Sequence, residues 1–150
     1  MPDAKSPKET PVIAGPLVRL AAFMYDGLLL MALWFILGVV FVAINGGEGV
    51  QQGNPFFRSA VFLIWVWFNL YFWRRGGQTL GMRAWRLQLQ STTGKPLSLM
   101  QGMIRLIVAV PAFALAGLGY FWAWIDKEKL TWHDRYSETR VVRLPKEEKK

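Results

Sequence analysis

The sequence predicts an all-α membrane protein with two full transmembrane helices, a third broken, re-entrant or spanning helical segment, and a small cytoplasmic two-stranded β element. Three observations support this fold class. Of the 150 residues 53% are hydrophobic, the formal net charge of +8 is crowded into short segments, and three long runs are almost free of charge. A soluble domain of this size is less apolar and more evenly charged. We therefore expect a polytopic membrane protein.

The three apolar runs define the expected membrane segments, at about residues 17–44, 56–73 and 104–125. A helix needs about 20 apolar residues to cross roughly 30 Å of hydrocarbon, and the first and third runs are long enough. The second reaches that length if the side chain of Arg58 extends to the interface. Beyond its first turn, the first run carries one charge, Asp26.

The positions of Lys and Arg predict how the chain is oriented. The connection 45–57 has no Lys or Arg, whereas the connection 74–102 has five basic residues and no acid. Basic loops remain in the cytoplasm, so the amino terminus is expected to be cytoplasmic. Residues 1–16, polar and with four prolines, are expected to form a flexible cytoplasmic tail. Residues 17–144 then form the membrane domain, and residues 145–150 a charged tail.

The third run leaves two topologies open. A single crossing by residues 104–125 would place the following tail outside, although that tail holds eight basic residues. Pro111, Gly117 and Gly119 mark positions where a helix could break and turn back. These observations favour a re-entrant or broken segment, with both termini cytoplasmic, over a simple third crossing.

Two short segments have the pattern of β-strands. Within residues 83–90, Trp85, Leu87 and Leu89 alternate with polar residues, and residues 139–144 are rich in β-branched side chains. Isolated strands are unstable, so we expect the two segments to pair with each other on one side of the membrane.

Asp26 is the residue that most needs an explanation. A charged Asp near the centre of a spanning helix costs about 2.5 to 3.5 kcal/mol, so its side chain should face other helices or a wet cavity. A structural role would pair it with a polar group, for which Asn69, Gln78 and Thr79 are candidates. A functional role would make it a cation or proton site. Both interpretations remain open from the residues alone.

Four separated motifs appear in order along the chain: "LVRLAAFMYDGLLL", "GGQTLGMRAWRLQL", "GKPLSLMQGMIRL" and "GLGYFWAWIDKEKLTWHDRYSETRVV". Together they resemble the RDD family of bacterial membrane proteins over residues 17–144. The family is named for one arginine and two aspartates, which the resemblance places at Arg19, Asp26 and Asp134. It implies the bacterial inner membrane and transport of an unidentified ligand. Glu138 departs from the pattern, which has a small residue there, so the loop after Asp134 is expected to differ locally.

A cytoplasmic tail would bring Asp134 back to the membrane surface beside the start of the first helix. Arg19 needs an anionic partner there, either a side chain or a lipid phosphate. We therefore predict an ion pair between Arg19 and Asp134, the alternative being that both face headgroups and water. Possible supporting residues of this polar site are Asn69, Arg105 and His133.

Several classes of site are absent from the sequence. It has no cysteine, and His133 is its only histidine, so a metal site within one chain is not expected. It contains no nucleophile with a base and an acid inside the membrane, and no glycine-rich phosphate-binding loop. We expect no enzyme activity and no cofactor.

The basic residues flank apolar spans, which favours a bilayer with anionic lipid as partner over nucleic acid. Two functional classes remain. The protein could be a component of a transporter or channel for a cation or small solute, with Asp26 on the path. It would then assemble as a homo-oligomer or with a membrane protein partner, because two or three spans enclose too little volume for a pore. Alternatively it is a non-transporting accessory or assembly protein, whose Arg and Asp residues hold the helices and a cytoplasmic tail together.

Overall fold

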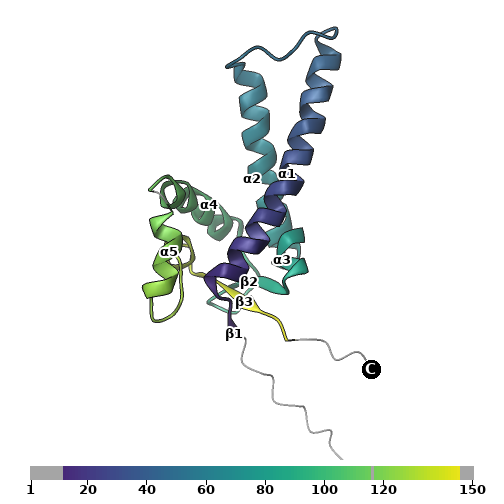
Figure 1. Cartoon of the computed structure of the whole chain (residues 1–150). Helices are drawn as coiled ribbons and strands as arrows, with labels where there is room; N and C mark the ends of the chain where they lie inside the picture. The colour runs from purple at the N-terminus through teal and green to yellow at the C-terminus, as the bar shows by residue number, and fades with distance from the viewer. Residues whose placement is uncertain (1–11, 116, 146–150) are drawn as a thin grey trace, which may run out of the picture.

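The computed structural model describes residues 12–115 and 117–145. Two long helices, α1 (Pro16–Ile44) and α2 (Pro55–Gly76), form a hairpin that extends away from the rest of the protein (Figure 1). The other elements gather at the end of the hairpin where α1 begins and α2 ends. These helices match the predicted segments 17–44 and 56–73, apart from one residue at the start of each and three at the end of α2.

Local sequence explains where the hairpin helices begin and end. Both start with proline, whose fixed φ suits the first helical turn. The side chain of Asn54 accepts a hydrogen bond from the backbone N–H of Phe57 and caps α2. The α2 helix ends at Gly77, which has φ +68 and lies so close to the Leu89 carbonyl that a Cβ would overlap it. Gly77 thus turns the chain directly toward the sheet.

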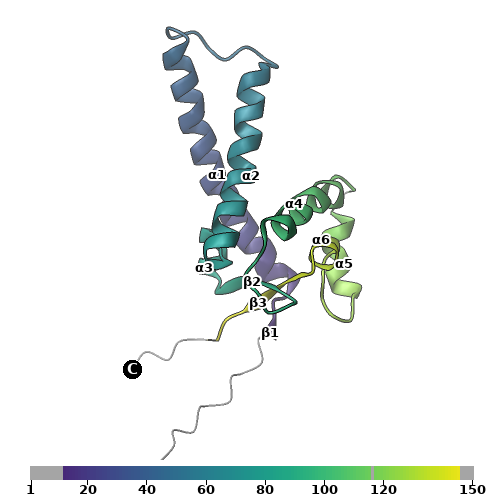
Figure 2. The ribbon, with the colours of Figure 1, turned by 180° about the vertical axis from the view of Figure 1, so that it is seen from behind.

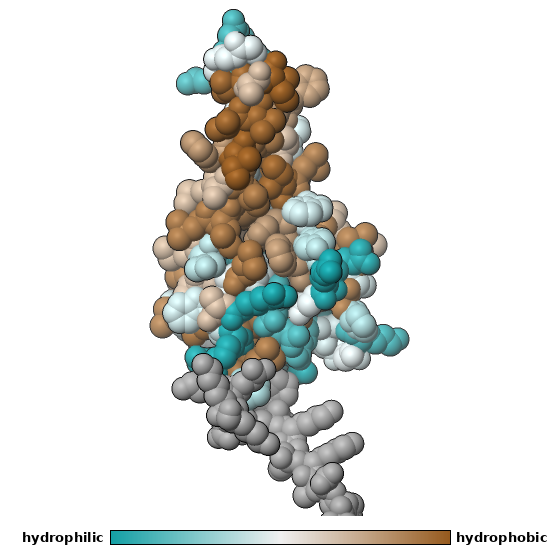
Figure 3. Space-filling model, turned by 90° about the vertical axis from the view of Figure 1, so that its right-hand side faces the viewer, coloured by the Kyte–Doolittle hydropathy of each residue, from teal (hydrophilic) through white to brown (hydrophobic). Residues whose placement is uncertain are grey.

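The hairpin exposes a long apolar surface. Helices α1 and α2 are long and apolar enough to cross a membrane, and few of their residues are buried inside the protein. Apolar side chains cover the extended part of the hairpin, whereas polar side chains gather at the end that carries the sheet (Figure 3). An unpartnered apolar surface of this extent is what lipid would cover. The protein is therefore a membrane protein.

The sheet has three strands, not the predicted two. The β3 strand (Thr139–Arg143) pairs antiparallel with β2 (Leu87–Ser91) on one side and with β1 (Val12–Ile13) on the other. The predicted pairing of the two longer strands is confirmed. The β1 strand lies in the segment 1–16 that is predicted as a flexible tail, and with two residues it is too short to show an alternating pattern. The other parts of the predicted tails, residues 1–11 and 146–150, lie outside the described residues.

A short helix corrects the predicted start of the second strand. Residues 80–84 form α3 (Leu80–Ala84), which begins where the Thr79 hydroxyl accepts a hydrogen bond from the backbone N–H of Met82. The strand therefore starts at Leu87 and not at residue 83. Trp85 consequently does not share the buried face of Leu87. The threonine cap signals a helix start that the alternating pattern concealed.

The third apolar run is broken, as predicted. It forms α4 (Leu99–Ala114) and α5 (Leu118–Ile125), which meet at an angle of 95°. Pro111 lies inside α4, and the break falls just before Gly117, which adopts φ +75. After α5 comes α6 (Trp132–Tyr136), which leads into β3. Since β2 and β3 pair, the chain leaves and re-enters the same sheet, and α4 to α6 lie together beside it (Figure 2).

The main hydrophobic core lies at the junction of the sheet with the hairpin. Ala22 of α1 and Met82 of α3 pack there against residues of the sheet and of the segment before α1. Those residues are Ala14, Leu87, Leu89 and Val141. Trp73 and Val18 pack against the edge of this core. The core thus holds the first turns of α1 against the sheet. Arg19 and Asp26 are both on this part of α1, so the core fixes the backbone from which the two polar side chains project.

Candidate functional site

A buried carboxylate with two arginine partners lies where α1, α4 and α6 meet. Asp134 is fully buried; one of its carboxylate oxygens is 2.5 Å from Nη1 of Arg19, and the other accepts a hydrogen bond from Nη1 of Arg105. The predicted ion pair of Arg19 and Asp134 is therefore present in the structure. It is buried, however, and Arg105, proposed only as a supporting residue, is an equal partner. We call these three residues the arginine cluster.

Each member of the arginine cluster comes from a different element. Arg19 is in the first turn of α1, and its Nε donates to the Ala14 carbonyl. Arg105 is on α4 and also donates to the Thr139 hydroxyl. Asp134 is held by a capping box at the start of α6, in which Thr131 and Asp134 each bond the backbone N–H of the other. The cluster joins α1, α4 and α6.

Burial and the charges around α6 decide the protonation of His133 and Asp134. Burial by itself would raise the pKa of Asp134, but the positive charges of Arg105 and Arg19 outweigh it and hold that pKa below its usual range. Burial, aided by the Arg105 charge and opposed by Asp134, lowers the pKa of His133 to about 3. At neutral pH the cluster therefore contains two cations, one anion and, beside them, a neutral imidazole.

Asp26 forms a second polar contact, separate from the arginine cluster. Its carboxylate accepts hydrogen bonds from the Thr79 hydroxyl at 2.5 Å and from the backbone N–H of Gly81 at 2.8 Å. Of the three candidate partners, Thr79 is thus the one that binds it. Gly81 has no space for a side chain, because a Cβ there would lie 2.2 Å from the Ala22 carbonyl oxygen. Asp26 therefore fastens α3 closely against α1.

The other two candidate partners bind elsewhere. The amide nitrogen of Asn69 donates to the Trp65 carbonyl one turn earlier on α2, and that of Gln78 donates to the Leu87 carbonyl. Asn69 nevertheless lines the same cavity as Asp26, Arg105 and His133.

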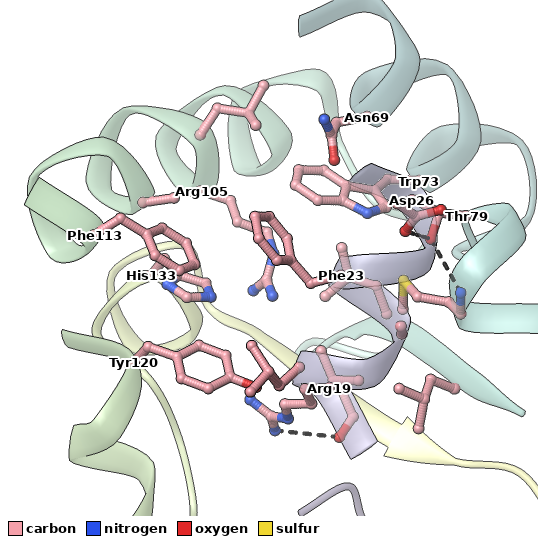
Figure 4. A pocket seen from close by; sticks show the side chains of 18 of the residues that line it. Arg19, Phe23, Asp26, Asn69, Trp73, Thr79, Arg105, Phe113, Tyr120 and His133 are labelled. Carbon is pink, nitrogen blue, oxygen red and sulfur yellow. Dashed lines mark hydrogen bonds between the residues drawn. The ribbon is translucent and has the colours of Figure 1, made fainter. Parts of the chain in front are cut away.

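This cavity has a volume of about 130 Å³ and lies between α1, α2 and α4, with α5 and α6 closing one side (Figure 4). Asp26, Thr79 and Asn69 stand at one end, which we call the oxygen end. Arg105 and His133 stand at the other, which we call the cationic end. Most of the remaining wall is apolar, including Leu20, Phe23, Leu106, Ala109 and Phe113. The cavity is therefore amphipathic, with two polar ends of different chemistry.

Sequence reasoning missed three contributors to this site. The backbone N–H of Gly81 donates a hydrogen bond to Asp26, and the sequence shows only a glycine two residues after Thr79, the N-cap of α3. The guanidinium carbon of Arg105 lies over the ring of Trp73, 5.3 Å from the ring centroid. Tyr120 lines the cavity, and its hydroxyl donates to the Pro16 carbonyl. Among the residues that the structure describes, no group of three or more acidic or histidine side chains is placed to hold a metal ion.

Comparison with protein families identifies the chain. The sequence model of the RDD family matches residues 13–138. The chain belongs to the RDD family. Two of the residues that the resemblance assigned to the family name, Arg19 and Asp134, bind each other in this RDD protein, while Asp26 binds α3. Neither a curated protein nor a solved structure matches the chain.

Glu138, where we expected a small residue, has an unusual backbone. It adopts φ +51, a left-handed conformation that glycine takes without strain. Its carbonyl accepts hydrogen bonds from the backbone N–H and hydroxyl of Thr92 and from the Gln101 side chain. The bonds on that carbonyl hold the loop after Asp134 in a shape that would suit a small residue better.

Proposed function

We propose that this RDD protein is a component of a transporter or channel that carries a cation or protons past Asp26. The observation that supports the proposal most strongly is the position of the Asp26 carboxylate, which lies on a candidate span and borders a cavity. Ionisable residues in spans frequently belong to ion or proton paths.

The chemistry of the oxygen end fits a cation. A carboxylate offers about four acceptor positions, and the structure fills two of those on Asp26. Asn69 uses its amide nitrogen in the bond to Trp65, and its side-chain oxygen faces the cavity (Figure 4). Oxygen atoms with spare acceptor capacity can bind a hard cation or pass a proton.

The proposal includes a topology. We propose a multi-pass protein of the bacterial inner membrane, with α1 and α2 crossing and the sheet end in the cytoplasm. The basic residues near the sheet support this orientation, among them Arg74, Arg75, Arg83 and Arg86. In this arrangement α4 and α5 form the re-entrant segment. Because so few spans enclose little volume, the transporting unit would be a homo-oligomer or a complex with another membrane protein.

A second candidate is an accessory or assembly protein without transport activity. It is favoured by the observation that Arg19, Asp26 and Asp134 each bind another element of the chain. In both proposals the protein is not an enzyme, needs no cofactor and does not bind nucleic acid.

Flux measurements on Asp26→Asn separate the two candidates. Purified wild type and variant would be reconstituted into liposomes with a pH-sensitive dye and Na⁺ or K⁺ gradients, and thermal unfolding would be followed in detergent. Glu128→Gln removes an equal charge at an exposed position and is the matched control. The transport proposal predicts flux in wild type and control, loss of at least tenfold in Asp26→Asn, and similar stability. Absence of flux in wild type, with a destabilised variant, would contradict it and support the accessory role.

A further inference from the structure

The cationic end of the cavity contains donors that the protein itself does not use. Arg105 employs Nη1 for its bonds to Asp134 and Thr139, and within the described ranges the structure gives its Nε and Nη2 no acceptor. His133 is 7% exposed, and its Nδ1 is buried without a hydrogen-bond partner. The ring nitrogens of His133 lie on the side that faces Arg105 and Tyr120 (Figure 4). A buried polar atom without a partner is costly, and a bound ligand would relieve that cost.

The charge at this end is positive. The two guanidinium groups of the arginine cluster face a single carboxylate, which leaves a net charge of +1. Asp26 is at the oxygen end, where its two hydrogen bonds turn it toward α3. Guanidinium groups bind phosphate and carboxylate oxygens with paired N–H donors, and partial burial strengthens such contacts. The ligand class indicated by Arg105 and His133 is therefore an anion.

The rest of the wall indicates that this anion has an apolar part. From the cationic end, the cavity is lined by Leu106, Ala109 and Phe113 of α4 and by Phe23 of α1, whose ring stacks on that of Phe113. Phe23 and Phe113 are also partly exposed on the outer surface, where the candidate span α1 would meet lipid. Trp73 covers the Arg105 guanidinium and restricts approach from the α2 side. A small inorganic anion would leave this apolar wall uncovered.

We propose that the cavity binds the phosphate group of an anionic phospholipid, with Arg105 and His133 donating to the phosphate oxygens and the apolar wall of α4 contacting the adjoining chain. This inference goes beyond the proposed transport function, because it concerns equilibrium binding at the opposite end of the cavity. A chain that binds the lipid and shows no ion flux would refute the transport proposal alone. A chain that shows flux and no lipid preference would refute this inference alone.

The test is native mass spectrometry of the purified full chain, titrated with phosphatidylglycerol or with phosphatidylcholine. Ala109→Leu fills the cavity one helical turn from Arg105 and leaves all three residues of the arginine cluster in place, and Ala114→Leu makes the same change at an exposed position of the same helix. His133→Phe removes the unused donor and preserves an aromatic ring against Phe113. Thermal unfolding of every variant verifies that it folds.

We expect one phosphatidylglycerol per chain, preferred at least tenfold over phosphatidylcholine in wild type and in Ala114→Leu. Ala109→Leu should lose that preference, and His133→Phe should weaken it several-fold. Inorganic phosphate is the probe for a soluble source: if it stabilises wild type but not Ala109→Leu while the lipid does not, the lipid assignment is overturned and a free phosphate site replaces it. Equal binding of both lipids, or unchanged preference in a folded Ala109→Leu, would refute the proposal.

Discussion

Neutralising Asp134 is the perturbation with the largest expected effect on stability. Asp134→Asn leaves the guanidinium groups of Arg19 and Arg105 buried together without their shared carboxylate. Removing one partner from a buried ionic group costs about 3 to 5 kcal/mol, because an uncompensated charge stays in the interior. Replacing Arg19 by Met removes a charge but leaves a neutral pair, so we expect a smaller loss of about 1 to 3 kcal/mol.

The assay is equilibrium unfolding in a mild detergent, followed by tryptophan fluorescence. Asp126→Asn is the matched control, since Asp126, whose side chain is 11% exposed, pairs with Arg135, whose side chain is 56% exposed. The unpaired Arg135 charge can reach water, so the control should lose only about 1 kcal/mol, well below the loss expected for Asp134→Asn. If Asp134→Asn is no less stable than Asp126→Asn, the arginine cluster does not stabilise the fold.

The structure also changes what a charge exchange should do. A two-residue contact would allow Arg19→Asp and Asp134→Arg to rescue each other. Here the exchange would place two guanidinium groups, at position 134 and at Arg105, within the same buried space. We therefore expect the doubly exchanged protein to remain destabilised by several kcal/mol. Full recovery of the unfolding free energy would show that Arg105 is not a partner.

Three further predictions concern single positions. His133 has a folded pKa of about 3 against 6.5 in the unfolded chain, so stability should fall by about 2 kcal/mol between pH 7.5 and pH 5 and His133→Phe should flatten this slope; an unchanged slope in unfolding titrations would contradict it. Glu138→Gly should raise the unfolding free energy by up to about 1 kcal/mol, because glycine adopts a positive φ without strain. A lower unfolding free energy would show that the backbone at Glu138 is not strained. Gly81→Ala should cost about 1 to 3 kcal/mol through its overlap with α1, and Gly27→Ala, which has open space, should be neutral or better; equal effects would contradict the close contact.

The membrane part of the fold could be predicted because its signals are local and long. A long apolar run leaves few alternatives to a helix in a bilayer, and both hairpin helices follow such runs, the second with Arg58 near its start. The break in the third run was also visible in its proline and glycines. The β1 strand and α3 could not be found in the same way, because each is short and is stabilised by tertiary pairing rather than by its own pattern.

The candidate site was predictable only in part. Arg19 and Asp134 could be joined because both needed a partner at the same membrane surface. The equal role of Arg105 was not evident, since an arginine near the start of an apolar run also suits an interface. The bond of Asp26 to a backbone N–H of α3 depended on a helix that the alternating pattern concealed, and no spacing rule could have identified the cavity between three helices.

We propose that ions cross the membrane through the cavity that Asp26 borders. The most direct measurement is ion flux in proteoliposomes that contain wild type, Ala109→Leu or Ala114→Leu at equal reconstituted amounts. Filling the cavity should reduce flux at least tenfold in Ala109→Leu, while Ala114→Leu should match wild type. Equal flux in all three proteins would show that ions do not pass through this cavity, and no flux in wild type would contradict transport itself.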